Sequence, residues 1–196
     1  ADSGGPAPAE PKASGSSKVL IGDGGNRVLQ FQVDGLTWTY ERVFAEGAYE
    51  GKALTSPMGI CQDSQGRVYI GEQTAGGRVL RFDAQGSYID TVATDGVGGF
   101  LCRPEAVVFG PDGHVYTVDA FGAGDQVYRI NISTKQSTIF VPKRFDGTRD
   151  LNNPRGVSFG PGGNCFVSGR QNNAVFEFDG SNGSFIRTFV EVNTPE

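Results

Sequence analysis

Apolar and polar residues alternate in short runs along most of the chain. In residues 78–82 (RVLRF), 126–130 (QVYRI) and 174–178 (AVFEF), an apolar residue stands on each side of a charged one. A period of two is typical of half-buried β-strands, whose successive side chains point to opposite faces. No segment of a dozen residues has helical periodicity, and no run approaches the roughly 18 apolar residues of a membrane span. The pattern predicts an all-β protein without a membrane span.

The strands group into a repeat of four. The predicted complete copies cover residues 57–93, 104–141 and 154–190, and an incomplete copy covers residues 19–45. Each complete copy opens with a proline, at Pro57, Pro104 and Pro154, and has a glycine turn after its first strand, at Gly66, Gly113 and Gly163. A four-stranded repeat of this length is the size of a propeller blade. We therefore predict a β-propeller of about four blades of antiparallel sheet, the first incomplete, which forms its own ring or part of a larger or shared ring.

The first 17 residues differ in composition from the rest. They are rich in Pro, Ala, Gly and Ser and predict a tail, residues 1–17, in front of a propeller domain, residues 18–196. The sequence begins at Ala1, which favours removal of a targeting peptide, with an artificial chain boundary as the alternative. Removal of such a peptide predicts an extracytoplasmic location: secreted, periplasmic or in an organelle lumen.

Charge and cysteine content exclude some functions. The net charge is −5 and the 17 Lys and Arg residues are scattered, which argues against a general affinity for nucleic acid or for anionic membranes. The cysteines form no C-x-x-C pair and have no nearby histidine, so a zinc site on them is not expected. Cys165 aligns with core valines of the other copies, and a disulfide between Cys61 and Cys102 is left open.

The segment IGDGGNRVLQF resembles the NHL-type repeat, through Asp23, Asn26, Arg27 and Val28. The phrases FGPDGHVY and FGPGGNCFV are similar to the wider group of NHL and virginiamycin-lyase-like propellers. The resemblance covers residues 19–193 and implies the blade architecture, but it hardly specifies a function.

Several members of that group are lyases or lactonases with a metal in the central channel, held by histidines and carboxylates. This chain has a single histidine, His114, beside a hairpin turn. Asp23, Glu72 and Asp119 fall at one equivalent position in three copies, where they could hold Ca²⁺ or Zn²⁺. The alternative is that they bond nearby backbone N–H groups and shape their loops. No serine or cysteine nucleophile is framed by a base, so no catalytic residue is assigned.

The connections between copies are the variable parts of the repeat, and variable parts carry the individuality of a repeat protein. They hold aromatic and basic residues of the kind that anchors interfaces. The candidate contact residues in these connections are Tyr49, Phe100, Arg103, Lys143, Arg144, Phe145 and Arg149, and the loops after the second strand add Phe121 and Arg170. For Phe100 and Phe145 the alternative is that they plug gaps between blades.

Two functions are therefore weighed. The first is a non-catalytic binding or assembly module, a protein–protein interaction subunit of a larger complex or of a homo-oligomer, which uses the interblade-loop face and the N-terminal tail and needs no cofactor. The second is a divergent propeller lyase or hydrolase with a carboxylate-bound divalent metal in the central channel.

Overall fold

The computed structural model describes residues 16–97, 103–120 and 124–191, and we name four sheets in chain order. Sheet 1 consists of β1 (Ser17–Asp23), β2 (Arg27–Asp34) and β3 (Thr37–Ala45). Sheet 2 consists of β6 (Pro57–Gln62), β7 (Val68–Glu72), β8 (Arg78–Phe82) and β9 (Tyr88–Thr94). Sheet 3 consists of β10 (Pro104–Phe109), β11 (Val115–Asp119), β12 (Gln126–Ile130) and β13 (Ser137–Val141). Sheet 4 consists of β14 (Pro154–Phe159), β15 (Cys165–Gly169), β16 (Ala174–Phe178) and β17 (Phe185–Glu191). A small hairpin, β4 (Ala48–Tyr49) and β5 (Lys52–Ala53), lies between sheets 1 and 2.

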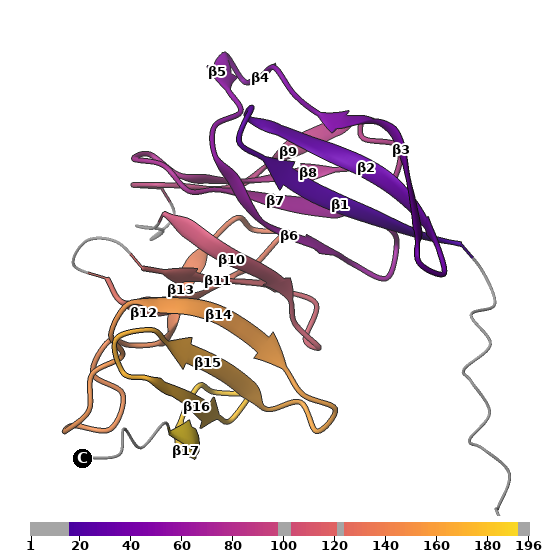
Figure 1. Ribbon diagram of the computed structural model, residues 1–196. Helices are drawn as coiled ribbons and strands as arrows, with labels where there is room; N and C mark the ends of the chain where they lie inside the picture. The colour runs from indigo at the N-terminus through magenta and orange to yellow at the C-terminus, as the bar shows by residue number, and fades with distance from the viewer. Residues whose placement is uncertain (1–15, 98–102, 121–123, 192–196) are drawn as a thin grey trace, which may run out of the picture.

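Every sheet is antiparallel, and its strands lie side by side in chain order. The sheets follow one another along an arc, from sheet 1 in indigo to sheet 4 in yellow (Figure 1). Within the described residues, no strand pairs with the free edge of β1 in the way that β6 pairs with β7 in sheet 2. The predicted incomplete first blade is therefore confirmed for this part of the chain. No helix long and apolar enough to cross a membrane occurs in the described ranges.

The first hairpin of each four-stranded sheet depends on a glycine. Gly66, Gly113 and Gly163 have φ angles of +80°, +79° and +84°. This left-handed backbone is disfavoured for residues with a Cβ atom, so the turn requires glycine at this point. The geometry of this turn thus explains why a glycine recurs at the same place in each complete repeat.

Three hydrophobic clusters fill the spaces between successive sheets. The cluster between sheets 2 and 3 contains Tyr69 and Val79 from sheet 2 and Val115 and Ile130 from sheet 3, each completely buried. Corresponding clusters join sheet 1 to sheet 2 and sheet 3 to sheet 4. We call the side of a sheet that packs on the following sheet its forward face, and the side that packs on the preceding sheet its backward face. Each cluster joins a forward face to a backward face.

Polar side chains also tie one sheet to the next. Asn26, in the turn between β1 and β2, accepts a hydrogen bond at Oδ1 from the backbone N–H of Ser56, before sheet 2 (2.9 Å). Asp125, at the equivalent turn of sheet 3, accepts one from the N–H of Asn153, before sheet 4 (3.0 Å). Both residues have left-handed backbone, and asparagine and aspartate tolerate it better than most residues. The Asn of the NHL-like signature therefore joins sheets.

Candidate functional site

Asp23, one of the three candidate metal ligands, lies at the end of β1. Its Oδ2 accepts hydrogen bonds from Arg27 Nε (3.0 Å) and Nη2 (2.6 Å), and its Oδ1 accepts one from the N–H of Gly25 (2.9 Å). The bond from Arg27 is the main cause that holds the pKa of Asp23 below its usual value. This carboxylate shapes its own turn.

Glu72, at the end of β7, is almost completely buried. Its carboxylate accepts hydrogen bonds from Arg78 Nε (2.5 Å) and Nη2 (3.0 Å) and from the backbone N–H of Thr55 (2.9 Å). The Arg78 guanidinium, itself 3% exposed, also donates through Nη1 to the carbonyl oxygen of Tyr49 (2.8 Å). This ion pair therefore fastens the β4–β5 connection to sheet 2.

Asp119 and its counterpart in sheet 4 lie at the same kind of junction. Asp119 is buried, and its Oδ1 lies 3.5 Å from the backbone nitrogen of Arg103. In sheet 4 the position is Gly169, and a Cβ atom there would lie 2.1 Å from Oδ1 of Asn172. That amide oxygen accepts a hydrogen bond from the N–H of Asn152 (2.8 Å), as Glu72 does from Thr55. In both sheets a polar side chain holds the chain segment that leads into the first strand.

These carboxylates are not assembled into a metal site. In residues 16–97, 103–120 and 124–191, no group of three or more His, Cys, Asp or Glu side chains is placed to hold a metal ion. His114 lies in a turn, with its Nδ1 3.1 Å from the carbonyl oxygen of Asp112. The loop-shaping alternative accounts for the contacts of Asp23 and Glu72.

The aromatic residues of the connections pack inward. The Phe145 ring lies 4.9, 5.3 and 5.1 Å from the rings of Phe176, Phe178 and Phe185. The Tyr49 ring stacks on Tyr88 at 5.1 Å. Phe145 thus fills the apolar space beside sheet 4, as the gap-filling alternative for it held, and Tyr49 packs beside sheet 2. Their role in contact with a partner stays a prediction. Phe100 and Phe121 lie outside the described residues.

Basic residues of the connections pair with nearby acids. Lys143 Nζ lies 2.9 Å from Asp125 Oδ2, Arg144 Nε lies 2.9 Å from Asp150 Oδ1, and Arg149 Nε lies 2.6 Å from Asp146 Oδ2. Arg149 also covers the Phe185 ring at 4.4 Å. Arg103 and Arg170 are exposed. Exposed pairs of this kind add little to stability and remain accessible at the rim of a surface.

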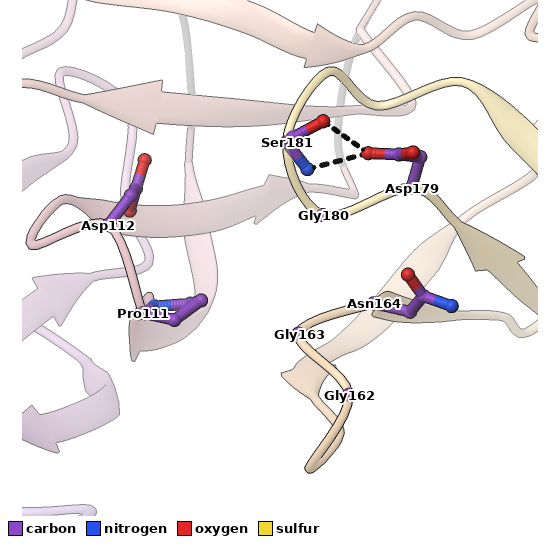
Figure 2. Close-up of a pocket in the computed structure, with 8 residues that line it drawn as sticks. All are labelled: Pro111, Asp112, Gly162, Gly163, Asn164, Asp179, Gly180 and Ser181. Atoms are coloured by element: carbon purple, nitrogen blue, oxygen red, sulfur yellow. Dashed lines mark hydrogen bonds between the residues drawn. The ribbon is translucent and has the colours of Figure 1, made fainter.

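A polar hollow of about 500 Å³ lies between the turns of sheets 3 and 4 (Figure 2). Its lining residues are Pro111, Asp112, Gly162, Gly163, Asn164, Asp179, Gly180 and Ser181. The carboxylates of Asp112 and Asp179 each accept hydrogen bonds from residues of their own sheet. Asp179 Oδ1 accepts hydrogen bonds from the N–H (2.8 Å) and hydroxyl (2.5 Å) of Ser181, and Asp112 Oδ2 accepts one from the hydroxyl of Tyr116 (2.8 Å). This hollow is built of turn backbone, and we assign it no ligand.

The feature that the sequence interpretation missed is the exposure of two sheet faces. On the backward face of sheet 1, Ile21 is 41% exposed and Tyr40 is 53% exposed. Ile70, at the position of Ile21 in sheet 2, is completely buried. Strand pairing places further apolar residues on this face of sheet 1: Val19, Leu29, Phe31, Val33, Trp38 and Val43.

The forward face of sheet 4 is exposed in the same way. Phe189 and Val190 are 48% and 47% exposed, whereas Phe140 and Val141, at the equivalent positions of sheet 3, are 8% and 0% exposed. A groove of about 280 Å³ crosses this face. It is lined by Gly156, Val157, Ser158, Phe166, Ser168 and Val175. We call this face and the backward face of sheet 1 the terminal faces.

Comparison with known proteins shows which solved structures have a fold similar to that of this chain. No family model and no curated protein matches the sequence. Among solved structures, an inactive virginiamycin B lyase from Staphylococcus aureus, crystallised with quinupristin, is similar with a TM-score of 0.58 at 16% identity, over 94% of this chain and 58% of the lyase. A putative gluconolactonase is similar with a TM-score of 0.61 at 17% identity, over 92% and 70% of the two chains. The chain has a β-propeller fold.

This similarity concerns the fold alone, because the identities are low. The chain spans a little over half the length of the lyase structures that it matches. In a closed propeller each blade packs between two neighbours. In the described part of this propeller, sheets 2 and 3 have two neighbours, whereas sheets 1 and 4 each expose a face built for one.

Proposed function

We propose that this chain is a non-catalytic binding and assembly module whose terminal faces bind protein. The observation that supports the proposal is the exposure of apolar side chains at positions that are buried in every internal sheet contact. Ile21 of sheet 1 is 41% exposed, whereas its counterparts Ile70 and Thr117 are completely buried. Soluble proteins rarely leave a contiguous apolar face open unless it is an interaction site.

The composition of these faces suits a protein partner. Phe31 lies edge-on to Trp38 (6.3 Å) and to Tyr40 (5.8 Å), so an aromatic cluster occupies the backward face of sheet 1. Aromatic residues are enriched in protein interfaces, since they bury much area with few rotatable bonds. The exposed Arg144, in the connection between sheets 3 and 4, and the exposed Arg170, in the loop between β15 and β16, contribute at most a polar rim to this interaction.

The enzymatic alternative has less support from the contacts. The Glu72 carboxylate accepts hydrogen bonds from Arg78 and Thr55, and the Asp23 carboxylate accepts them from Arg27, so both already have donors within the chain. The lyases and the lactonase-like protein share the fold, but a fold hosts unrelated functions.

Affinity capture with the tagged chain from the source organism tests the proposal. Wild-type chain and the variant Leu36→Arg should retain the same protein in stoichiometric amount, while the double variant Ile21→Arg with Phe189→Arg, which changes both terminal faces, should lose it. Leu36 is the matched control, since it is apolar and 99% exposed but lies in the turn between β2 and β3 rather than on the face. Equal retention by the double variant would contradict the terminal-face proposal. Stoichiometric metal that resists dialysis would favour the enzymatic alternative.

A further inference from the structure

We infer that the protein bound at the terminal faces is a second copy of this chain, which joins head to tail so that two copies form one ring. The inference rests on the proposed function, because it names the occupant of the same faces. Each copy would place the forward face of its sheet 4 on the backward face of its partner's sheet 1, and the same contact would recur on the other side.

The contacts between successive sheets of the chain all follow one rule. Sheets 1 and 2, 2 and 3, and 3 and 4 all pack with a forward face on a backward face. The exposed faces are one of each kind: a backward face on sheet 1 and a forward face on sheet 4. The chain thus exposes both halves of a contact that it already makes three times.

An aromatic pair occurs at equivalent positions of sheets 3 and 4, and it is covered by another sheet in sheet 3 but exposed in sheet 4. In sheet 3, Tyr116 lies edge-on to Phe140 at 5.0 Å, and Phe159 of sheet 4 covers the pair at 4.8 Å from Tyr116. Sheet 4 repeats the pair at the equivalent positions, where Phe166 lies edge-on to Phe189 at 4.9 Å. Phe140 is 8% exposed, but Phe189 is 48% exposed. The second pair is therefore built to be covered by another sheet.

The groove on the forward face of sheet 4 includes a repeat position that contacts the following sheet elsewhere in the chain. Between sheets 2 and 3, a Cβ atom on Gly71 would lie 2.6 Å from Cγ2 of Val107 and 2.8 Å from Cβ of Pro104. Small residues here let the next sheet approach closely. In sheet 3 the equivalent position is Val118, which is completely buried against sheet 4, and in sheet 4 it is Ser168, which lines the open groove. This position therefore contacts the following sheet in sheets 2 and 3, whereas in sheet 4 it is open.

The polar contact between sheets is also repeated at the exposed end. Asn173 occupies the turn position of Asn26 and Asp125 and has the same left-handed backbone, with φ of +53°. Asn26 and Asp125 each accept a hydrogen bond from the chain before the next sheet, whereas Asn173 is exposed at the edge of the forward face of sheet 4. Apolar, aromatic and polar elements of the internal contact thus all recur there.

The number of sheets agrees with closure. One copy supplies four sheets, and two copies supply eight, at the upper end of the four to eight blades typical of propellers. A head-to-tail contact either closes with a two-fold axis or continues as a filament. The four sheets follow one another along an arc (Figure 1), so the same kind of contact at each end would continue the curve in the direction of closure.

The test uses the purified chain alone, so that it is independent of any other protein. Light scattering at about 100 µM, where a Kd of about 1 µM gives nearly complete association, should give twice the chain mass of 20.8 kDa. Trp38 is the only tryptophan and lies on the backward face of sheet 1, 54% exposed. Its emission should therefore shift to the blue and become protected from acrylamide as the concentration rises.

Two surface variants give the decisive measurement. Ile21→Arg and Phe189→Arg each change one half of the contact, so each breaks both contacts of its own homodimer. Each should raise the dimer Kd about 1,000-fold, from about 1 µM to about 1 mM, and so be mostly monomeric at about 100 µM. Mixed together, they should form a heterodimer through the one intact contact, with Phe189→Arg supplying sheet 1 and Ile21→Arg supplying sheet 4. Leu36→Arg should dimerise like wild type. Far-UV circular dichroism confirms that each variant is folded, and Val190→Lys replaces Phe189→Arg if that variant does not fold.

Three results would overturn the inference. One is a wild-type monomer at about 100 µM, far above a Kd of about 1 µM, with Trp38 still open to acrylamide. Another is a homodimer of either single variant with wild-type affinity, which would mean a face paired with its own kind. The third is failure of the mixed variants to pair. The proposed function would still hold after any of these results if the affinity capture retains another protein and variants of the terminal faces lose it. The two proposals therefore fail separately.

Discussion

The buried pair of Glu72 and Arg78 gives a test of the structural role that we assign to the equivalent carboxylates. We predict that Glu72→Gln unfolds the chain at a lower denaturant concentration. The substitution keeps the size of the side chain but removes the negative charge, so the Arg78 guanidinium loses its counter-charge while it stays buried.

The magnitude follows from the contacts. Glu72 and Arg78 are 1% and 3% exposed, and two of the guanidinium nitrogens donate to the carboxylate. Removing one partner of such a buried pair costs about 3–5 kcal/mol. The amide oxygen can still accept the Thr55 N–H, so we expect a loss near 3 kcal/mol, about a fifth to three fifths of the stability of a typical domain.

Urea unfolding followed by circular dichroism measures this loss, and two controls sharpen it. Asp23→Asn changes the equivalent residue of sheet 1, whose pair with Arg27 faces solvent, and should change the midpoint far less. The double variant Glu72→Leu with Arg78→Met removes both charges and should recover part of the loss.

Two results would refute the reasoning. If Glu72→Gln lowers the free energy of unfolding by less than about 1 kcal/mol, the Glu72–Arg78 pair does not stabilise the fold as a buried ion pair. If Glu72→Gln and Asp23→Asn both abolish the binding of a stoichiometric metal, the two carboxylates serve a metal site instead of their loops.

Three further predictions concern other parts of the chain. Phe145→Ala should lower the free energy of unfolding by about 2–4 kcal/mol in urea, because the ring packs on three phenylalanines, while Arg144→Ala should leave it nearly unchanged. Burial raises the pKa of the Cys165 thiol to about 12, so in a Cys102→Ser variant a thiol reagent at pH 8 should label Cys165 only after denaturant is added. Burial alone would raise the pKa of Asp63, but hydrogen bonds from Arg67 and Gln65 hold that pKa below the ordinary value of 3.8. The ionised Asp63 therefore stabilises the folded chain above pH 3.8, and this stabilisation is lost as the pH falls through the lower pKa of the folded state. An unchanged urea midpoint for Asp63→Asn at pH 7 would contradict this role of Asp63.

The repeat and the strands could be predicted from the sequence because they depend on local rules. A glycine with positive φ at Gly66, Gly113 and Gly163 and an alternating strand such as residues 174–178 are legible from neighbouring residues. Core positions were legible too: Cys165 aligns with valines and is completely buried.

The candidate site was predicted less well, since exposure depends on residues far away in the chain. Phe145 lies in a connection of charged and polar residues, yet it packs against β16 and the start of β17. Asn172 replaces the missing carboxylate of sheet 4 from three residues beyond Gly169, which an alignment of equivalent positions does not show.

The sequence alone determined that this chain builds propeller blades, because the period of the strands and the turn residues that separate them are local properties. Only the tertiary structure decided which blade faces are covered. Ile21 and Ile70 occupy the same place in the repeat and have the same chemistry, but one is 41% exposed and the other is fully buried. The physical reason is that burial between blades depends on whether another sheet lies against the face, and a repeat sequence describes each blade without describing its neighbour.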